Sequence, residues 1–218
     1  SAKAVRGSVT NPSDLDRLYE AVEAERGGLD ILFANAGTGS FARLGEITPE
    51  HYDQIFDVNV KGLVFTVQKA LPLMTEGASI ILTGSSTGVM GTPQFSVYSA
   101  TKAAVTTISD SLRIEAKGKI KVTTVKPTGI TGTNLASWIV NDTAIMGLVG
   151  QRAASYGEHV TALLNDDLPA ELTDVDSIKY WLIKPEDLAD AVVHVIDQPW
   201  GISLSDVTVR ASGEDYLY

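Results

Sequence analysis

Leu29-Asp-Ile-Leu-Phe-Ala34 is a short, nearly continuous apolar run, and Asn35-Ala36-Gly37 opens a glycine-rich loop directly after it. Runs of this kind are typical of strands that are buried on both faces of a parallel sheet. A helical pattern over about 13–26 precedes the run, and Gly27-Gly28 ends that helix. Helix, strand and glycine loop in this order indicate an alternating α/β chain.

The same alternation extends along the chain in both directions. We expect a strand at Lys3–Val9, and a long helix that is capped by Thr48 and begins at Pro49. Further strands and helices are expected in turn at 79–83, 96–117, 120–125, 185–197 and 206–210. The sequence therefore predicts one α/β domain over 1–218, a doubly wound parallel sheet with helices on both faces.

The composition excludes several classes of protein. Lys and Arg number 17 against 27 Asp and Glu, so the formal net charge of −10 argues against a basic nucleic-acid footprint. The absence of cysteine excludes disulfides, thiolate metal sites and a cysteine nucleophile, and we expect no metal site. No apolar run approaches the roughly 18 residues of a membrane span, and no signal peptide is seen. We therefore expect a cytoplasmic protein without a membrane partner.

Small polar residues follow three of the expected strands. They occupy 35–37, 84–88 and 126–133, and each segment contains glycine. Ligands of open parallel sheets bind beyond the carboxyl ends of the strands, where small residues let a ligand approach the backbone. Glycine and serine also serve ordinary turns, so one such loop alone would predict little. Three at one sheet edge favour a shared ligand crevice.

Tyr98 and Lys102 stand four residues apart at the start of a helix, and so share one face. An ammonium group beside a phenol lowers the pKa of the phenol, which makes tyrosine a usable acid/base near neutral pH. The alternative is an exposed tyrosine beside a solvated lysine. Ser85 lies in the preceding loop, thirteen residues before Tyr98, where its hydroxyl would hold a substrate carbonyl oxygen.

Asn59 shares the apolar stripe of its expected helix with Ile55 and Phe56. A buried mid-helix asparagine is costly unless it is hydrogen-bonded. It is either a satisfied core amide or a group that fixes a water next to Lys102 and so forms a proton route.

Together these residues resemble the short-chain dehydrogenase/reductase family. Asn35-Ala36-Gly37 matches its N-A-G, Asn59-Val-Lys-Gly62 its catalytic asparagine segment, Ser85 its serine, and Tyr98-Ser-Ala-Thr-Lys102 its Y-x-x-x-K. Each motif alone is weak, but four in family order are specific. The similarity extends from Val5 to Arg210.

The resemblance implies a Rossmann-like fold and a nicotinamide cofactor, NAD or NADP. Tyr98 would be the general acid/base, Lys102 would lower its pKa and hold the nicotinamide ribose, Ser85 would orient the substrate, and Asn59 would hold a relay water. Besides Tyr98 and Lys102, the implied cofactor contacts are Val9, Asn35, Ala36, Gly37, Pro127, Thr128, Gly129, Ile130 and Thr133.

Three departures from the family pattern touch the cofactor. The opening strand, the T-G-x-x-x-G-x-G turn, the first helix and the second strand are absent, roughly fifty residues and more than one βαβ unit. Ser8 replaces an aspartate, and Pro127-Thr128 replaces P-G. Since the chain starts at Ser1 without Met, we expect an incomplete record of an enzyme. A truncated, non-catalytic dinucleotide-sensing or scaffold protein is the main alternative, and an epimerase or dehydratase a third.

Residues 134–182 are expected to form a substrate lid, as the insert does in the family. They contain two basic and seven acidic residues among many apolar ones. An acidic lid disfavours phosphorylated, CoA-linked or carrier-bound substrates and favours a neutral carbonyl compound or alcohol. The alternative is that these residues only pack the lid and cover its surface. The resemblance also implies a homotetramer, because the helices from Pro49 and Ser96 commonly pair with their copies in the family. Five of their residues are too apolar for an exposed face, although packing within the subunit could use some of them: Val64, Val67, Ala103, Ile108 and Leu112.

Overall fold

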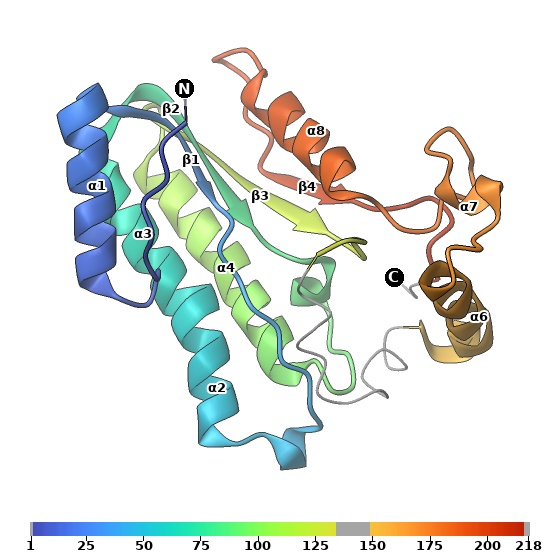
Figure 1. The fold of residues 1–218 in the computed structure, drawn as a ribbon. Helices are drawn as coiled ribbons and strands as arrows, with labels where there is room; N and C mark the ends of the chain where they lie inside the picture. Colours follow the sequence, from blue (N-terminus) through green and yellow to red (C-terminus); the bar gives the residue numbers. More distant parts are fainter. Residues whose placement is uncertain (1, 134–148, 216–218) are drawn as a thin grey trace.

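A four-stranded parallel sheet forms the centre of the molecule (Figure 1). The computed structural model describes residues 2–133 and 149–215. The strands are β1 (Leu29–Ala34), β2 (Met74–Thr83), β3 (Lys121–Pro127) and β4 (Asp206–Val209), in the spatial order β1-β2-β3-β4. Leu32 lies opposite Ile80, and Ile80 opposite Val122, so three apolar side chains form a row across the sheet.

Helices cover both faces of this sheet. On one side lie α1 (Pro12–Arg26), α3 (Leu63–Ala70) and α4 (Ser96–Glu115), and on the other lies α8 (Pro185–Ile196) (Figure 1). Ile80 and Ile81 are neighbours on β2 and both are fully buried, Ile80 against the α3–α4 side and Ile81 against α8. The predicted doubly wound parallel α/β fold is confirmed.

Local signals start the helices where the sequence placed them. The Asn11 side chain accepts a hydrogen bond from the backbone of Ser13, and Gly27 ends α1 with φ of 70°. Thr48 caps α2 (Pro49–Phe56) in the same way. A π-helical turn over Asp57–Gly62 then joins α2 to α3 and puts one extra residue into each turn. The long helix predicted from Pro49 is confirmed, whereas its π-helical interruption was not expected.

The strand expected at Lys3–Val9 is wrong. The segment follows α1 instead: the backbone N–H of Ser8 donates to Asp14 over 2.9 Å, and the carbonyl of Arg6 accepts from Arg17. Extended residues become a strand only by pairing, and no described strand lies beside this segment. Its hydrogen bonds go to helix side chains for that reason.

The prediction that β1 is buried on both faces is also wrong. Leu32 and Ala34 are buried, but Ile31 and Phe33 on the opposite face are 43% and 41% exposed. The apolar cluster that packs on that face joins α8 to β2, β3 and β4, and within the described residues it includes no side chain of β1. The apolar residues of β1 therefore predict more burial than the described residues provide.

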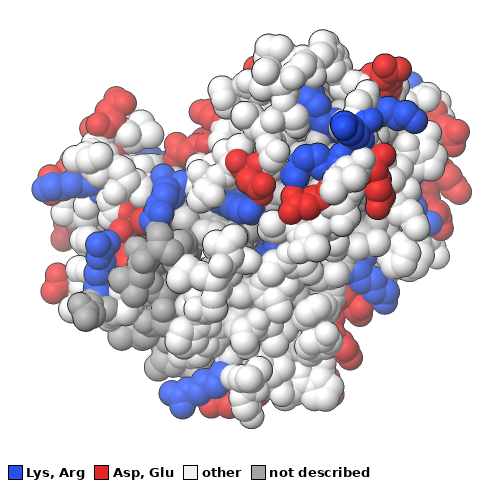
Figure 2. All heavy atoms as spheres, turned by 180° about the vertical axis from the view of Figure 1, so that it is seen from behind, with Lys and Arg blue, Asp and Glu red and all other residues white. Residues whose placement is uncertain are grey.

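Beyond the sheet, α6 (Ala153–Leu164) and α7 (Ala170–Thr173) form a smaller lobe (Figures 1 and 2). Figure 2 shows Lys and Arg side chains interspersed with Asp and Glu on the face seen from behind. The first part of the expected lid, 134–148, lies outside the described residues. Over the described ranges, no helix is both long and apolar enough to cross a bilayer.

Two of the residues expected at a subunit interface serve the interior instead. Val67 and Leu112 are buried in the core between α3, α4 and the sheet. Val64 is 36% exposed and remains available on the surface of α3. The tetramer itself stays a prediction.

Candidate active site

Lys102 is a buried lysine on α4. Only 5% of its surface is exposed, and its Nζ donates a hydrogen bond of 3.0 Å to the backbone carbonyl of Thr83, the last residue of β2. Burial disfavours the charged ammonium and lowers the pKa of Lys102 to about 8. The helix therefore holds a cation, still protonated at neutral pH, against the carboxyl edge of the sheet.

Tyr98 lies one turn before Lys102 and is buried as well. Its ring centroid is 5.7 Å from Lys102 Nζ. Phe41 meets the tyrosine ring edge-on at 5.3 Å, and Phe95 does so at 6.3 Å. The alternative of an exposed tyrosine beside a solvated lysine is therefore wrong: aromatic packing fixes the ring and the helix fixes its neighbour.

Asn59 lies in the π-helical turn and is almost completely buried. Its Oδ1 accepts from the backbone N–H of Thr38 at 2.8 Å, and its Nδ2 donates to the Thr38 carbonyl at 2.8 Å and to Thr101 Oγ1 at 3.1 Å. The Asn59 side chain thus bonds to both backbone groups of Thr38, directly after Gly37, and so fixes the glycine loop. Because both amide hydrogens are used within the protein, a relay water would have to use the remaining lone pair of Oδ1 or the backbone.

Ser85 follows β2 and begins the 3₁₀ turn Ser86–Val89. Its Oγ accepts from the backbone N–H of Thr87 at 3.2 Å and lies 2.9 Å from the Thr87 hydroxyl. The turn packs directly on α4, since a Cβ on Gly88 would lie 2.8 Å from the backbone carbon of Lys102. Glycine at this position lets the serine loop and the Tyr98–Lys102 helix pack as one unit.

The predicted cofactor loops converge on the same sheet edge. Asn35 accepts from the Thr83 hydroxyl at 2.8 Å, and a Cβ on Gly37 would lie 3.5 Å from Asn59 Oδ1 and 3.6 Å from Lys102 Nζ. Ala36 lies between these two residues in the chain. The strands β1 and β2 thus bring Asn35 and Gly37 to the buried lysine.

Pro127 is the last residue of β3. The loop that follows it contains Thr128, Gly129 and Ile130 and contacts the last strand and the segment before α8. Thr128 N donates to Val209 O at 3.1 Å, and Ile130 forms a backbone bridge with Ile183. Thr133, the end of the predicted contact set, is exposed at the limit of the described segment.

Val9 packs on the π-helical turn. A Cβ placed on Gly62 of that turn would lie only 2.7 Å from Val9 Cγ2. No cluster of three potential metal-ligating acids or histidines occurs within 2–133 and 149–215.

Three residues that build the site were not predicted. Phe41 packs on Tyr98, Thr38 is held by Asn59, and the Thr101 hydroxyl joins Asn59 to α4. The role of Thr101 could have been inferred from the sequence, because it is a hydroxyl-bearing residue inside the Tyr98–Lys102 motif. Thr38 takes part through its backbone, so its side-chain type carries no signal.

The sequence matches a known protein family and is similar to several known proteins. A family model described as short chain dehydrogenase matches residues 1–143. An uncharacterized oxidoreductase of Staphylococcus aureus strain MW2 is 33% identical over 213 residues, 96% of this chain and 76% of that protein. An oxidoreductase of Sarocladium schorii is 58% identical over 113 residues, and this match spans 51% of the chain and 45% of the relative.

Known structures share the fold. The alcohol dehydrogenase of Thermococcus sibiricus in complex with 5-hydroxy-NADP is 19% identical, with a TM-score of 0.74 over 97% of this chain and 75% of that one. A 3-ketoacyl-(acyl-carrier-protein) reductase of Brucella melitensis in complex with NADH is 24% identical, with a TM-score of 0.72 over 96% and 78%. Both likenesses show that the described chain shares the fold of these proteins.

Proposed function

From the fact that the chain belongs to the short-chain dehydrogenase family, we propose that it interconverts a neutral carbonyl compound and an alcohol, with NAD or NADP as the hydride carrier. One observation carries the proposal: Lys102 is buried beside Tyr98 at the carboxyl edge of the sheet, with its Nζ 5.7 Å from the ring. A buried cation is costly, and a structural role would be served by an uncharged side chain.

Tyr98 exchanges the proton with the substrate oxygen in this proposal. The ammonium of Lys102 favours the phenolate form, which allows the phenol to act as acid or base near neutral pH. With its pKa at about 8, Lys102 is mostly protonated at pH 7 and supplies that charge. Ser85, on the turn packed against α4, orients the substrate oxygen, and Asn59 acts by holding the loop around Gly37.

The residues at the sheet edge fit the ribose and nicotinamide of a dinucleotide. Lys102 Nζ uses one of its three hydrogens on Thr83, the one partner seen for it among the described residues, and lies beside the side-chain-free Gly37. The remaining hydrogens suit a ribose hydroxyl. One side of the cofactor would be lined by Asn35, Ala36 and Gly37, and the other by Pro127 to Ile130 and Thr133. Val9 would line the adenine side. When bound, the nicotinamide supplies or accepts the hydride.

The described part of the proposed lid supports a neutral substrate. Its two basic residues are already engaged: Lys179 pairs with Glu171 at 2.9 Å, and Arg152 donates to the Glu214 carbonyl at 3.1 Å. Phosphate and carboxylate groups are usually held by free arginine or lysine side chains. We further propose that 134–182 closes over the substrate within a single domain over 1–218, and that the protein works as a homotetramer in the cytoplasm.

The test combines binding and turnover. Fluorescence titration with NADH and NADPH measures cofactor affinity, and a panel of neutral ketones, aldehydes and secondary alcohols, with sugar phosphates and acyl thioesters for comparison, measures kcat/KM. The proposal expects binding of at least one dinucleotide and the highest kcat/KM for a neutral substrate. Binding without turnover on any substrate would favour a non-catalytic, dinucleotide-sensing relative.

A further inference from the structure

Thr101 lies next to Lys102 on α4 and is fully buried. Its hydroxyl makes two hydrogen bonds: Oγ1 donates to the Tyr98 carbonyl at 2.7 Å and accepts from Asn59 Nδ2 at 3.1 Å. The first bond lies within the helix, and the second joins the helix to the π-helical turn. One hydroxyl thus connects two of the residues proposed to act in the reaction.

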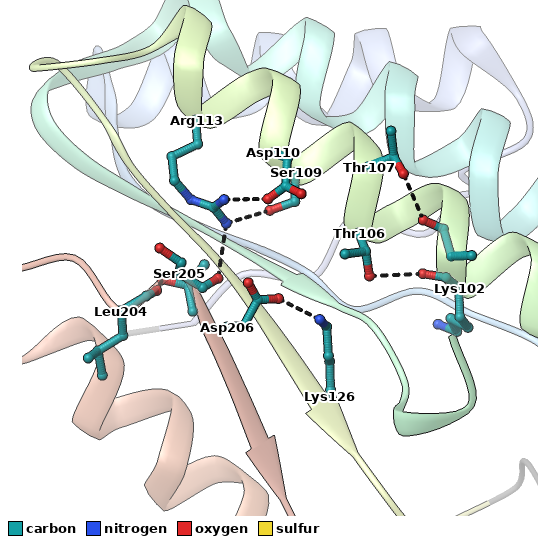
Figure 3. Close-up of polar contacts among 12 residues, drawn as sticks. Lys102, Thr106, Thr107, Ser109, Asp110, Arg113, Lys126, Leu204, Ser205 and Asp206 are labelled. Carbon is teal, nitrogen blue, oxygen red and sulfur yellow. Dashed lines mark hydrogen bonds and ion pairs between the residues drawn. The ribbon is translucent and has the colours of Figure 1, made fainter. Parts of the chain in front are cut away.

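Other threonines of α4 lack the second bond. The hydroxyls of Thr106 and Thr107 each donate to the carbonyl four residues back, Lys102 and Ala103, at 3.3 Å (Figure 3). Within the described residues, no group from another element bonds to either hydroxyl. A helical threonine commonly satisfies its hydroxyl on its own helix. The bond from Asn59 is therefore particular to Thr101.

The bond completes a chain of contacts across three elements. From the Tyr98 carbonyl it passes through the Thr101 hydroxyl to the Asn59 amide, and from there to the backbone N–H and carbonyl of Thr38. Gly37, the neighbour of Thr38, lies between Asn59 Oδ1 and Lys102 Nζ. The chain of hydrogen bonds therefore ends beside the buried ammonium, and each of its links is buried or half-buried.

We propose that Thr101 is a positioning residue, whose hydroxyl holds Asn59 and the Gly37–Thr38 backbone in place and thereby keeps the Lys102 ammonium enclosed beside Tyr98. Without the hydroxyl, one N–H of the Asn59 amide has no acceptor in a buried place, and a buried unpaired donor moves or admits water. Either response loosens the wall around Lys102. This inference rests on the proposed function for its catalytic consequence, but its effect on Lys102 belongs to the unloaded protein.

Two substitutions separate the hydroxyl from the shape of the side chain. Thr101→Val keeps the β-branched shape and removes the hydroxyl, whereas Thr101→Ser keeps the hydroxyl and removes a methyl group. A hydroxyl role expects loss in the valine variant and near-normal behaviour in the serine variant; a packing role expects the reverse. Thr107→Val is the matched control, because it removes a hydroxyl that bonds only within α4.

Two measurements are made on each variant. The first is the rate at which Lys102 is acetylated by acetic anhydride in the unloaded protein, read by mass spectrometry of the peptide. The second is kcat, KM and the pH profile of kcat with the best substrate and cofactor. For Thr101→Val we expect faster labelling of Lys102, a kcat lower by about tenfold to a hundredfold, as for small misplacements of reacting groups, and a displaced pH profile. Thr101→Ser and Thr107→Val should stay within about twofold of the wild type.

The outcomes separate this inference from the proposed function. A wild type that turns over no substrate contradicts the proposed function, and the labelling rates then decide the inference alone. An active wild type with unchanged labelling and unchanged kcat in Thr101→Val overturns the inference and leaves the function standing. If Thr101→Val does not fold, Thr101→Ser decides. A labelling rate and a kcat like those of the wild type support the hydroxyl role, whereas faster labelling and a lower kcat in folded protein contradict it.

Discussion

Replacing Lys102 by methionine should stabilise the protein while it removes activity. The pKa of the folded lysine is lowered from 10.5 to about 8 by burial. Since a tenfold change in proton affinity corresponds to about 1.4 kcal/mol, the charged ammonium costs the folded state about 3 kcal/mol. Lys102→Met removes this cost but also the hydrogen bond to the Thr83 carbonyl, worth about 1 kcal/mol. A net gain of about 2 kcal/mol remains at pH 7.

The gain should depend on pH in a defined direction. The folded protein releases the Lys102 proton near pH 8, whereas the unfolded chain keeps it until about pH 10.5. The unfolded state binds more protons between these values, so the wild type gains stability as pH rises through this window. Near pH 9.5 the cost of the lysine falls to about 1 kcal/mol, which is close to the value of the lost hydrogen bond. Wild type and variant should then be equally stable.

Thermal unfolding at pH 7 and pH 9.5 measures both effects. For a chain of this size, about 2 kcal/mol corresponds to a Tm higher by about 4 to 8 °C at pH 7, and the difference should vanish at pH 9.5. The control is Lys61→Met, which replaces an exposed lysine paired with Asp57 and should change stability by less than about 1 kcal/mol at either pH. If Lys102→Met is less stable than the wild type at pH 7, or if the difference in stability is independent of pH, the buried ammonium does not destabilise the fold.

Three further predictions follow from the same structure. Tyr98→Phe should keep the fold and lose at least about two orders of magnitude in kcat, and near-normal turnover would remove the phenol from the reaction. Gly88→Ala should lower activity, because its Cβ would lie 2.8 Å from the backbone of α4. Gly91→Ala is the control, since the space around Gly91 is open, and equal activities in the two variants would contradict the tight contact. Asp206→Asn should cost about 2 kcal/mol in urea unfolding, because it leaves the buried Lys126 without the partner 2.6 Å away (Figure 3), and an unchanged unfolding midpoint would show that the pair is not stabilising.

The central sheet was predictable because its strands carry their own signal. The apolar run of β1 and the buried neighbours Ile80 and Ile81 mark strands that need cover, and glycine or proline follows them. Lys3–Val9 was also expected to be a strand, and this prediction failed because a strand needs a paired neighbour and no local pattern states whether one exists. For the same reason, the exposure of Phe33 was not predictable from β1 itself.

The site was predictable as a set of side chains and not as a set of contacts. Helical spacing placed Tyr98 and Lys102 on one face, and the structure adds that both are buried. The partners of Asn59 depend on a π-helical turn that aims its amide at the Thr38 backbone, and such a turn has no reliable sequence pattern. The lowered pKa of Lys102 likewise follows from three-dimensional burial.

Hydride transfer assisted by Tyr98 and Lys102 can be followed by labelling the hydride itself. The protein is incubated with a neutral ketone substrate and with NADH or NADPH deuterated at the hydride position of the nicotinamide, and the alcohol formed is examined by mass spectrometry. We expect deuterium at the carbinol carbon of the product, and a product yield in Tyr98→Phe that is lower by at least about two orders of magnitude over the same time. Binding of the dinucleotide without any transfer of deuterium, or equal transfer in the Tyr98→Phe variant, would contradict this mechanism.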